Sequence, residues 1–132
     1  MALLVPNAAE DLVLQAIVNK TAAQTLVLKL YTNNVTPAEG DTEASYAEAG
    51  GSGYAAVTLT AASWTVTPGA PTAAEYPQVT FTFSGALGNV YGYFVVQTTS
   101  GKLMWAERFP GAPFNVQADG DQIKVTPRLT LE

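Results

Sequence analysis

The chain has 132 residues, of which 48% are hydrophobic and only 13% are charged, and its net charge is −5. Its six Lys and Arg residues are scattered, whereas nucleic-acid binding needs clustered positive charge to displace counterions, so a nucleic-acid partner is excluded. Because the chain contains no Cys and no His, disulfides, thiolate or imidazole metal sites and catalytic triads with a His base are excluded as well.

A chain of this length can bury one core, and we expect a single domain over residues 1–132. The sparse charge, against about 25% in average soluble proteins, has two explanations: a surface that meets other proteins, or a β surface rich in Thr and Ala. The opening residues lack the basic region of a signal peptide, and no apolar run approaches the roughly 20 residues of a membrane span. We therefore expect no membrane partner and synthesis in a cytoplasm.

The N-terminal segment, residues 1–20, predicts an apolar tail followed by a helix. Asn7 can cap a helix and Glu10 three residues later can reach back to it, which indicates a helix over residues 8–19. Apolar residues recur there at helical spacing and predict one buried stripe: Leu12, Val13, Ala16 and Ile17. The tail residues Leu3, Leu4 and Val5 would be sticky if exposed, so they predict either an anchor for a partner or a short strand or staple that packs on the chain's own helix.

From Thr25 the apolar period changes to two, which predicts a strand with one dry side. A long loop rich in small and turn-forming residues follows over residues 33–53. Loops of this length in small domains tend to be functional or disordered. We interpret this loop as an arm that becomes ordered only against an adjacent subunit.

The remainder of the chain predicts short strands joined by Gly and Pro turns, at residues 54–60, 64–66, 78–84, 90–97, 103–109 and 122–131. The segment 90–97 is apolar on both faces, as a central strand would be, and Gly92 marks a bulge or a close backbone approach. Pro127 should lie at an edge or a bulge. The predicted fold is mainly β, a β-sandwich or jelly-roll-like barrel of about six to eight strands with one N-terminal α-helix.

Acidic residues offer two weak metal hypotheses. Asp119-Gly120-Asp121 could belong to a calcium loop, but it lacks the further ligands of such a site, and an Asp-Gly hairpin turn is the better interpretation. The loop carboxylates, Glu39, Asp41, Glu43 and Glu48, are more typical of solvated charge than of a cation site. We therefore predict no metal and no cofactor.

Glu107 is the one candidate for acid–base chemistry, because a carboxyl group beside an indole such as Trp105 can act as a general acid. Glycoside hydrolysis needs a second carboxylate about 5 to 10 Å away, and the sequence identifies none. Glu107 and its neighbour Arg108 are better explained as structural or interface charges, so no catalytic residue and no enzymatic activity is predicted.

The aromatic residues could form a platform for sugars, but Tyr and Trp are equally suited to protein interfaces and to the core. Among them Tyr46, Tyr54 and Trp64 are candidate interface anchors. The complete predicted interface set is Leu3, Leu4, Val5, Tyr46, Tyr54, Trp64, Glu107 and Arg108.

Segments along nearly the whole chain carry a family resemblance. In order, they are LLVPNAAE, LKLYTNNVTPAEGDT, GGSGYAAVTLT, YGYFV, LMWAERF and GDQIKVTPRLTL. With these segments the chain resembles a family of small virion structural proteins of tailed bacteriophages. The resemblance implies a location in the virion after synthesis in the bacterial host, and no reaction.

Within a virion, a small β protein without an active site suits a capsid decoration or cement protein that binds the major capsid protein. We expect such a protein to form a homo-oligomer, with a trimer suited to the threefold positions of an icosahedral shell. The alternative is a tail or fibre-associated component, with exposed Tyr and Trp side chains that bind carbohydrate.

Overall fold

The computed structural model describes residues 4–18, 20, 22 and 24–131. These residues form one α-helix, eleven strands and two short 3-10 helices. In chain order the elements are α1 (Asn7–Ile17), β1 (Leu26–Tyr31), η1 (Glu43–Ser45), β2 (Val57–Leu59), η2 (Ala61–Ser63), β3 (Thr65–Thr67), β4 (Thr72–Glu75), β5 (Val79–Ser84), β6 (Gly88–Val90), β7 (Gly92–Gln97), β8 (Leu103–Arg108), β9 (Phe114–Val116), β10 (Asp119–Val125) and β11 (Arg128–Leu131).

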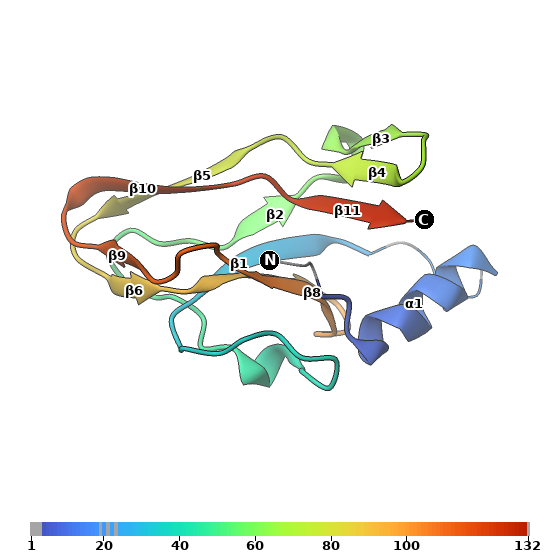
Figure 1. The fold of residues 1–132 in the computed structure, drawn as a ribbon, viewed down its shortest axis with the longest axis horizontal. Coiled ribbons are helices and arrows are strands. Elements are labelled where there is room, and N and C mark those ends of the chain that lie inside the picture. Colours follow the sequence, from blue (N-terminus) through green and yellow to red (C-terminus); the bar gives the residue numbers. More distant parts are fainter. Residues whose placement is uncertain (1–3, 19, 21, 23, 132) are drawn as a thin grey trace.

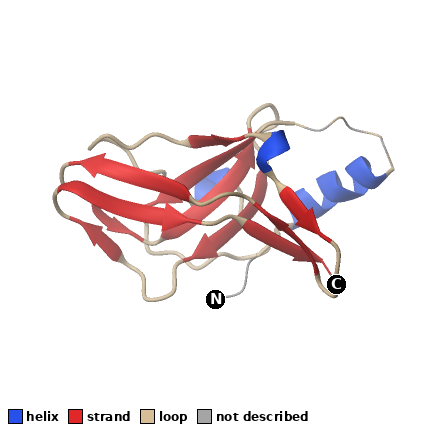
Figure 2. Ribbon diagram, turned by 90° about the horizontal axis from the view of Figure 1, so that it is seen from above, coloured by secondary structure: helices blue, strands red, loops and turns tan. Residues whose placement is uncertain are grey.

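The strands form two facing layers (Figure 1). One layer is the antiparallel sheet β2-β1-β7-β8, which the pair β6-β9 extends at one end. The other layer is the ribbon β5-β10, which continues along the chain into the sheet β11-β4-β3. Helix α1 lies at the end of the molecule opposite to β6 and β9 (Figures 1 and 2). The predicted mainly β, sandwich-like fold with one N-terminal helix is confirmed.

The main core lies between the two layers. In β5 every second residue is buried, as the alternation of Val79, Phe81 and Phe83 predicts. These side chains contact Leu28 and Val95 of the opposite sheet through one continuous cluster. The burial of apolar surface in this cluster is the principal stabilising contribution to the sandwich.

A second core covers the other face of the β1-β7-β8 sheet. Its buried side chains are Tyr31, Tyr46, Phe94, Val96, Leu103 and Ala106. The segment 32–50 passes over this face, at the bottom of Figure 1, and contributes Tyr46, whose ring stacks on Phe94 with centroids 5.1 Å apart. Strand β7 lies between β1 and β8, as predicted for a central strand. All of its residues are buried, because one face packs in the main core and the other in the second core.

This second core corrects two predictions. Strand β1 is covered on both sides rather than on one, since Tyr31 faces the outer cluster while Leu28 and Leu30 face the main core. The segment 33–53 is ordered against its own chain rather than against an adjacent subunit. The side chain of Asn33 fixes its course by donating to the Ser45 carbonyl oxygen at 2.9 Å and accepting from the Ala47 N–H at 2.8 Å.

The helix differs from its prediction in its cap and in its buried face. Pro6 occupies the N-cap position, and the Asn7 N–H donates to the Glu39 carbonyl oxygen at 3.3 Å, so Asn7 begins the helix instead of capping it. Only Ala9 and Leu12 are buried. The helix contacts the rest of the molecule mainly through β8. This contact leaves most residues of the predicted apolar stripe uncovered.

Several predicted strands are divided, which raises their number. Pro127 separates β10 from β11, and Tyr91 separates β6 from β7. The register of the β7-β8 pair shifts between Val95 and Val96 of β7. Leu103 therefore lies on the same face as Ala106, in the second core, whereas Trp105 lies in the main core. Strands β4 and β9 lie in stretches for which the sequence predicted no strand.

Candidate protein-interaction surface

Six large aliphatic side chains are exposed around one end of the sandwich, and we call this set the apolar end. Their exposed fractions run from 40% for Val13 to 74% for Leu131. The set is Val13, Leu14, Ile17 and Val18 in or directly after α1, Val66 in β3 and Leu131 in β11.

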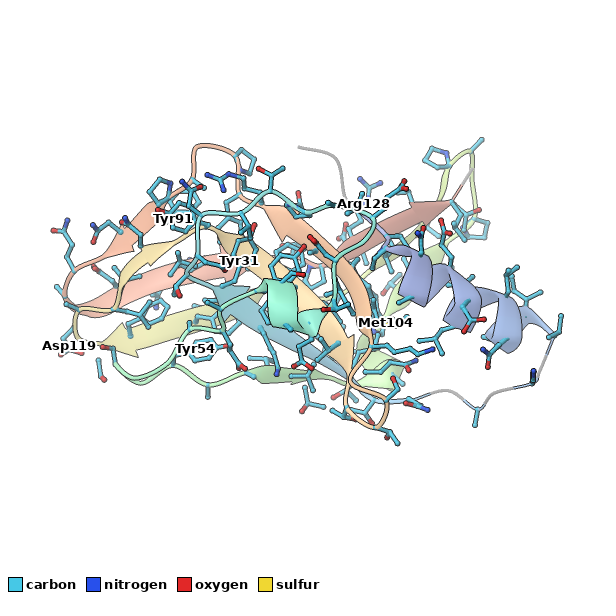
Figure 3. The ribbon with its side chains drawn as sticks, turned by 90° about the horizontal axis from the view of Figure 1, so that it is seen from below. Tyr31, Tyr54, Tyr91, Met104, Asp119 and Arg128 are labelled. Atoms are coloured by element: carbon cyan, nitrogen blue, oxygen red, sulfur yellow. The ribbon has the colours of Figure 1, made fainter. Side chains whose placement is uncertain are left out.

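Part of the apolar end is a groove of about 620 Å³ between α1 and the β11-β4-β3 sheet. Val13 and Leu14 line one wall, and Val66 and Leu131 line the other. Met104 of β8, beside α1 in Figure 3, also lines this groove. Glu10 is the one ionisable side chain among the lining residues that the structure describes.

Charged groups lie at the margin of this end rather than within it. Asp11 accepts from the Gln15 amide at 2.8 Å and lies 3.5 Å from the Lys102 ammonium group. The Gln15 hydrogen bond is the main reason that the pKa of Asp11 is lowered, with a smaller contribution from Lys102. Across the groove, Arg128 lies 3.8 Å from Glu75 on the adjacent strand. An apolar centre with a polar margin is the usual arrangement of a protein interface.

The N-terminal tail packs on its own chain. Leu4 exchanges two backbone hydrogen bonds with Ala106 of β8, at 3.3 and 3.2 Å. Val5 is half-buried against the main core and also lines the groove. Leu4 therefore pairs with its own chain as a short strand, but it lies against β8 rather than against the helix that the sequence suggested. Val5 lies at the groove. Leu3 lies outside the described residues.

Tyr46 lies inside the molecule, and Tyr54 is half-buried against the main core. The Tyr46 side chain is 5% exposed, and its hydroxyl donates to Asp41 at 2.7 Å. The Tyr54 hydroxyl accepts from the Leu30 N–H at 3.1 Å and donates to Glu48 at 3.2 Å. Burial raises the pKa of both tyrosines well above its usual value. The Tyr46 ring is not free to anchor a partner, which corrects the sequence-based choice of this residue. For the half-buried Tyr54 the interface role stays a prediction.

Trp64 is half-buried and packs edge-on against Tyr76 and Trp105, with ring centroids 5.2 and 6.2 Å away. Trp105 itself is 2% exposed. Trp105 is thus unavailable to a sugar ring, and Trp64 packs edge-on against it. The role of the half-buried Trp64 at an interface stays a prediction.

Glu107 and Arg108 support the sheet and the covering loop. The Tyr93 hydroxyl, directly across the strand pair, donates to Glu107 at 2.8 Å. Arg108 donates to the Val35 carbonyl oxygen at 2.9 Å, and its guanidinium group lies 5.1 Å from the centre of the Tyr91 ring. These contacts fit the structural interpretation of both charges, while their role at an interface stays a prediction.

The acidic residues of the loop are used internally. Lys29 lies 2.8 Å from Glu43 and 3.1 Å from Glu48, so the two carboxylates share one ammonium group. Desolvation tends to lower the pKa of Lys29, but the two carboxylates outweigh it and the pKa is raised. In the part of the chain that the structure describes, no three acidic side chains gather into a group that could hold a metal ion.

The Asp-Gly turn differs from its prediction. Asp119 and Gly120 begin β10, which pairs with β5, whereas β9 pairs with β6, so the two strands around the turn do not form a hairpin. Asp121 accepts from the backbone N–H groups of Gln117 and Ala118 at 2.8 and 3.0 Å. These bonds lower the pKa of Asp121 and fix the turn.

No protein-family model, no curated protein and no solved structure matches this chain. Among the described helices, none has the length and apolar character needed to cross a bilayer.

The apolar end was not predicted as a site. The available signal was the breadth of apolar residues around α1, from Leu12 to Val18, which is wider than one stripe on a short helix requires. Val66 and Leu131 carry no such signal, because single exposed aliphatic residues in strands are common.

Proposed function

We propose that this chain is a non-enzymatic structural protein of a tailed-phage virion, a capsid decoration protein that binds the assembled head as a homo-oligomer. The observation that carries the proposal is the apolar end, where six aliphatic side chains face solvent beside a groove almost without charge. Exposed apolar patches of this kind in soluble proteins mark contacts with other proteins. The family resemblance supports the virion as the place where the chain acts and the major capsid protein as the partner that the homo-oligomer binds.

The internal structure supports a passive, rigid role. The loop over residues 33–53 is held against the sandwich by contacts of Lys29, Asn33 and Arg108. A preorganised body loses little conformational entropy when it binds, which favours tight attachment to a repeating lattice.

The experiment is co-sedimentation of the purified chain with phage heads assembled without it. The expected result is saturable binding with a fixed ratio of chain to capsid subunit, and heads that withstand a higher temperature when the chain is bound. The variant Leu131→Asp should weaken binding at least tenfold. The matched variant Phe114→Asp places the same charge on an exposed apolar residue of β9, at the far end of the molecule (Figure 1), and should bind normally. Heads that sediment without the chain at every concentration would exclude the decoration role.

A polar pocket favours a second candidate, a carbohydrate-binding component of the tail or fibre. It has a volume of about 630 Å³, and Glu75, Tyr76, Gln78 and Arg128 are among its lining residues. An aromatic ring beside several hydrogen-bonding groups is a combination that can bind a sugar. A glycan array probed with the wild-type chain and with Tyr76→Ala tests this candidate, which requires a hit that the substitution removes.

A further inference from the structure

The apolar end has two unlike walls and no cover within the described chain. Leu14, Ile17 and Val18 project from the end of α1, and they are 64%, 71% and 69% exposed. Val66 and Leu131 lie on the strand side. We propose that a second copy of this chain covers the apolar end; the inference rests on the proposed protein-binding role and names the partner of that surface.

The size of the apolar end matches what a stable contact between two copies requires. A large aliphatic side chain that becomes buried removes roughly 60–120 Å² of apolar surface from water. Six side chains that are 40–74% exposed therefore leave about 350 Å² of apolar surface in water. A standard interface buries about 800 Å² on each partner, of which slightly more than half, or about 450 Å², is apolar. The half-buried Val5, Met104 and Leu129, which also line the groove, supply the remainder.

The distribution of charge favours a second copy over other partners. Each copy carries a net charge of −5, so two copies repel each other wherever acidic side chains would meet. The groove contains a single ionisable lining residue among those described, Glu10, and is therefore a face on which two acidic molecules can meet at small electrostatic cost. An anionic lipid surface fits poorly, because membrane-surface helices carry Lys and Arg on their polar face, whereas α1 has Glu10 in its first turn and no basic residue in its last turn.

The strand wall adds a source of backbone pairing. Strand β11 is at the edge of its sheet, with β4 on one side only. Edge strands offer unpaired N–H and C=O groups to another chain, and β-strand addition is a common mode of association. In a two-fold contact the helix wall of each copy can pack on the strand wall of the other, and in a three-fold ring the helix wall of one copy packs on the strand wall of the next. Both arrangements cover the same residues.

The test is sedimentation equilibrium of the full chain over a wide concentration range. The expected result is a dimer or a trimer whose dissociation constant rises at least 30-fold in Leu14→Asp and in Leu131→Asp, the change typical of losing one interface hot spot. Both positions are exposed, so these variants should fold as the wild type does. The variant Phe114→Asp should associate like the wild type. A wild-type chain that stays monomeric at every concentration, or an oligomer that neither substitution weakens, would overturn the proposal.

Cross-linking gives a second measurement that does not depend on weakened binding. Because the chain has no Cys, Ile17→Cys or Leu131→Cys introduces a unique thiol at the apolar end, and Phe114→Cys introduces one at the far end. A short bis-maleimide reagent applied to a mixture of the first two variants should give covalently linked pairs, and Phe114→Cys should not. Equal linking of all three variants would contradict the assignment of this surface.

The outcomes separate this inference from the proposed function. A monomer that still binds heads would overturn the self-contact and leave the decoration role intact. An oligomer dispersed by Leu14→Asp that binds no head would support the self-contact and exclude the decoration role. Flotation with anionic phospholipid vesicles should leave the chain unbound, and vesicle binding by a monomeric chain that Leu14→Asp abolishes would reassign the surface to lipid.

Discussion

Tyr31 of β1 lies across Gly92 of β7 so closely that a Cβ atom at Gly92 would be 2.6 Å from the Tyr31 hydroxyl oxygen and would overlap the Glu107 carbonyl oxygen. The two residues are opposite each other in the strand pair. Because Gly92 has no side chain, Tyr31 can lie flat on the sheet and contact Tyr46 of the covering loop, with ring centroids 5.0 Å apart. This relationship links the central strand of the sandwich to the segment that covers its outer face.

Replacement of Gly92 with Ala should destabilise the fold by about 3 kcal/mol, the upper part of the usual cost of overpacking, because one of the obstructing atoms belongs to the backbone. Urea unfolding would measure this loss. Gly50→Ala is the matched control, since nothing lies within 4 Å of the new methyl group, and it should change stability by less than about 0.5 kcal/mol. Equal stability of the two variants would show that Tyr31 does not lie across Gly92.

Removal of the Tyr46 ring should release the covering loop. Tyr46→Ala leaves a cavity beside Phe94 and should cost about 3–5 kcal/mol. Tyr46→Phe keeps the ring and loses the hydrogen bond to Asp41, at a cost of about 1 kcal/mol. Limited proteolysis provides the local readout: residues 33–53 should resist cleavage in the wild type and in Tyr46→Phe, and become cleavable in Tyr46→Ala. Rapid cleavage of the wild-type loop would restore the interpretation of this segment as a disordered arm.

Stability should decrease as the pH rises above 10. Burial is the main cause that raises the pKa of Tyr31 to about 12, and it also raises that of Tyr93. In the unfolded chain these phenols lose their protons near pH 10, whereas in the folded chain they retain them. The folded state therefore binds more protons in this range, and the free energy of unfolding decreases as the pH rises. Each such tyrosine contributes a slope of up to about 1.4 kcal/mol per pH unit between its unfolded and folded pKa values.

Urea unfolding between pH 8 and pH 11.5 would measure this slope. Tyr31→Phe should have a shallower decrease than the wild type, since one of the responsible groups is gone. A free energy of unfolding that is constant over this range would contradict the burial of these hydroxyl groups.

Lys29→Met should destabilise the protein by about 1 kcal/mol at pH 7, because it leaves Glu43 and Glu48 without their shared cation. Lys124→Met removes a charge from an exposed position of β10 and serves as the control, with a change below about 0.5 kcal/mol. Thermal unfolding of the three proteins at pH 7 would provide the comparison, and equal stability of Lys29→Met and the wild type would contradict the contribution of this ion pair.

Local sequence patterns predicted a strand well where one whole face is buried and the other exposed, or where both faces are buried. The alternation of Val79, Phe81 and Phe83 is preserved in β5, and the doubly apolar segment around Phe94 is the central strand β7. The covering loop could not be predicted in the same way. Its order depends on contacts between residues far apart in sequence, such as Tyr46 with Phe94, and loop composition carries no record of them.

The candidate site was less accessible to prediction than the fold. Helical periodicity shows which residues share a face of α1, but not whether another element covers that face, and here Ile17 and Val18 extend past the sheet. The strand wall depends on Val66 and Leu131, which become neighbours of α1 only through the sheet order β11-β4-β3. Sequence favoured aromatic residues as interface anchors, and the structure instead buries Tyr46 in its own core.

The central claim is that this chain works by binding other protein subunits in a virion, with its apolar end covered. Electron microscopy of the intact phage particle at side-chain resolution tests that claim most directly. The account predicts copies of the β-sandwich at repeating positions on the head, each with Leu14, Ile17 and Leu131 in contact with another subunit. Particles without this sandwich, or with the apolar end of every copy facing solvent, would contradict it.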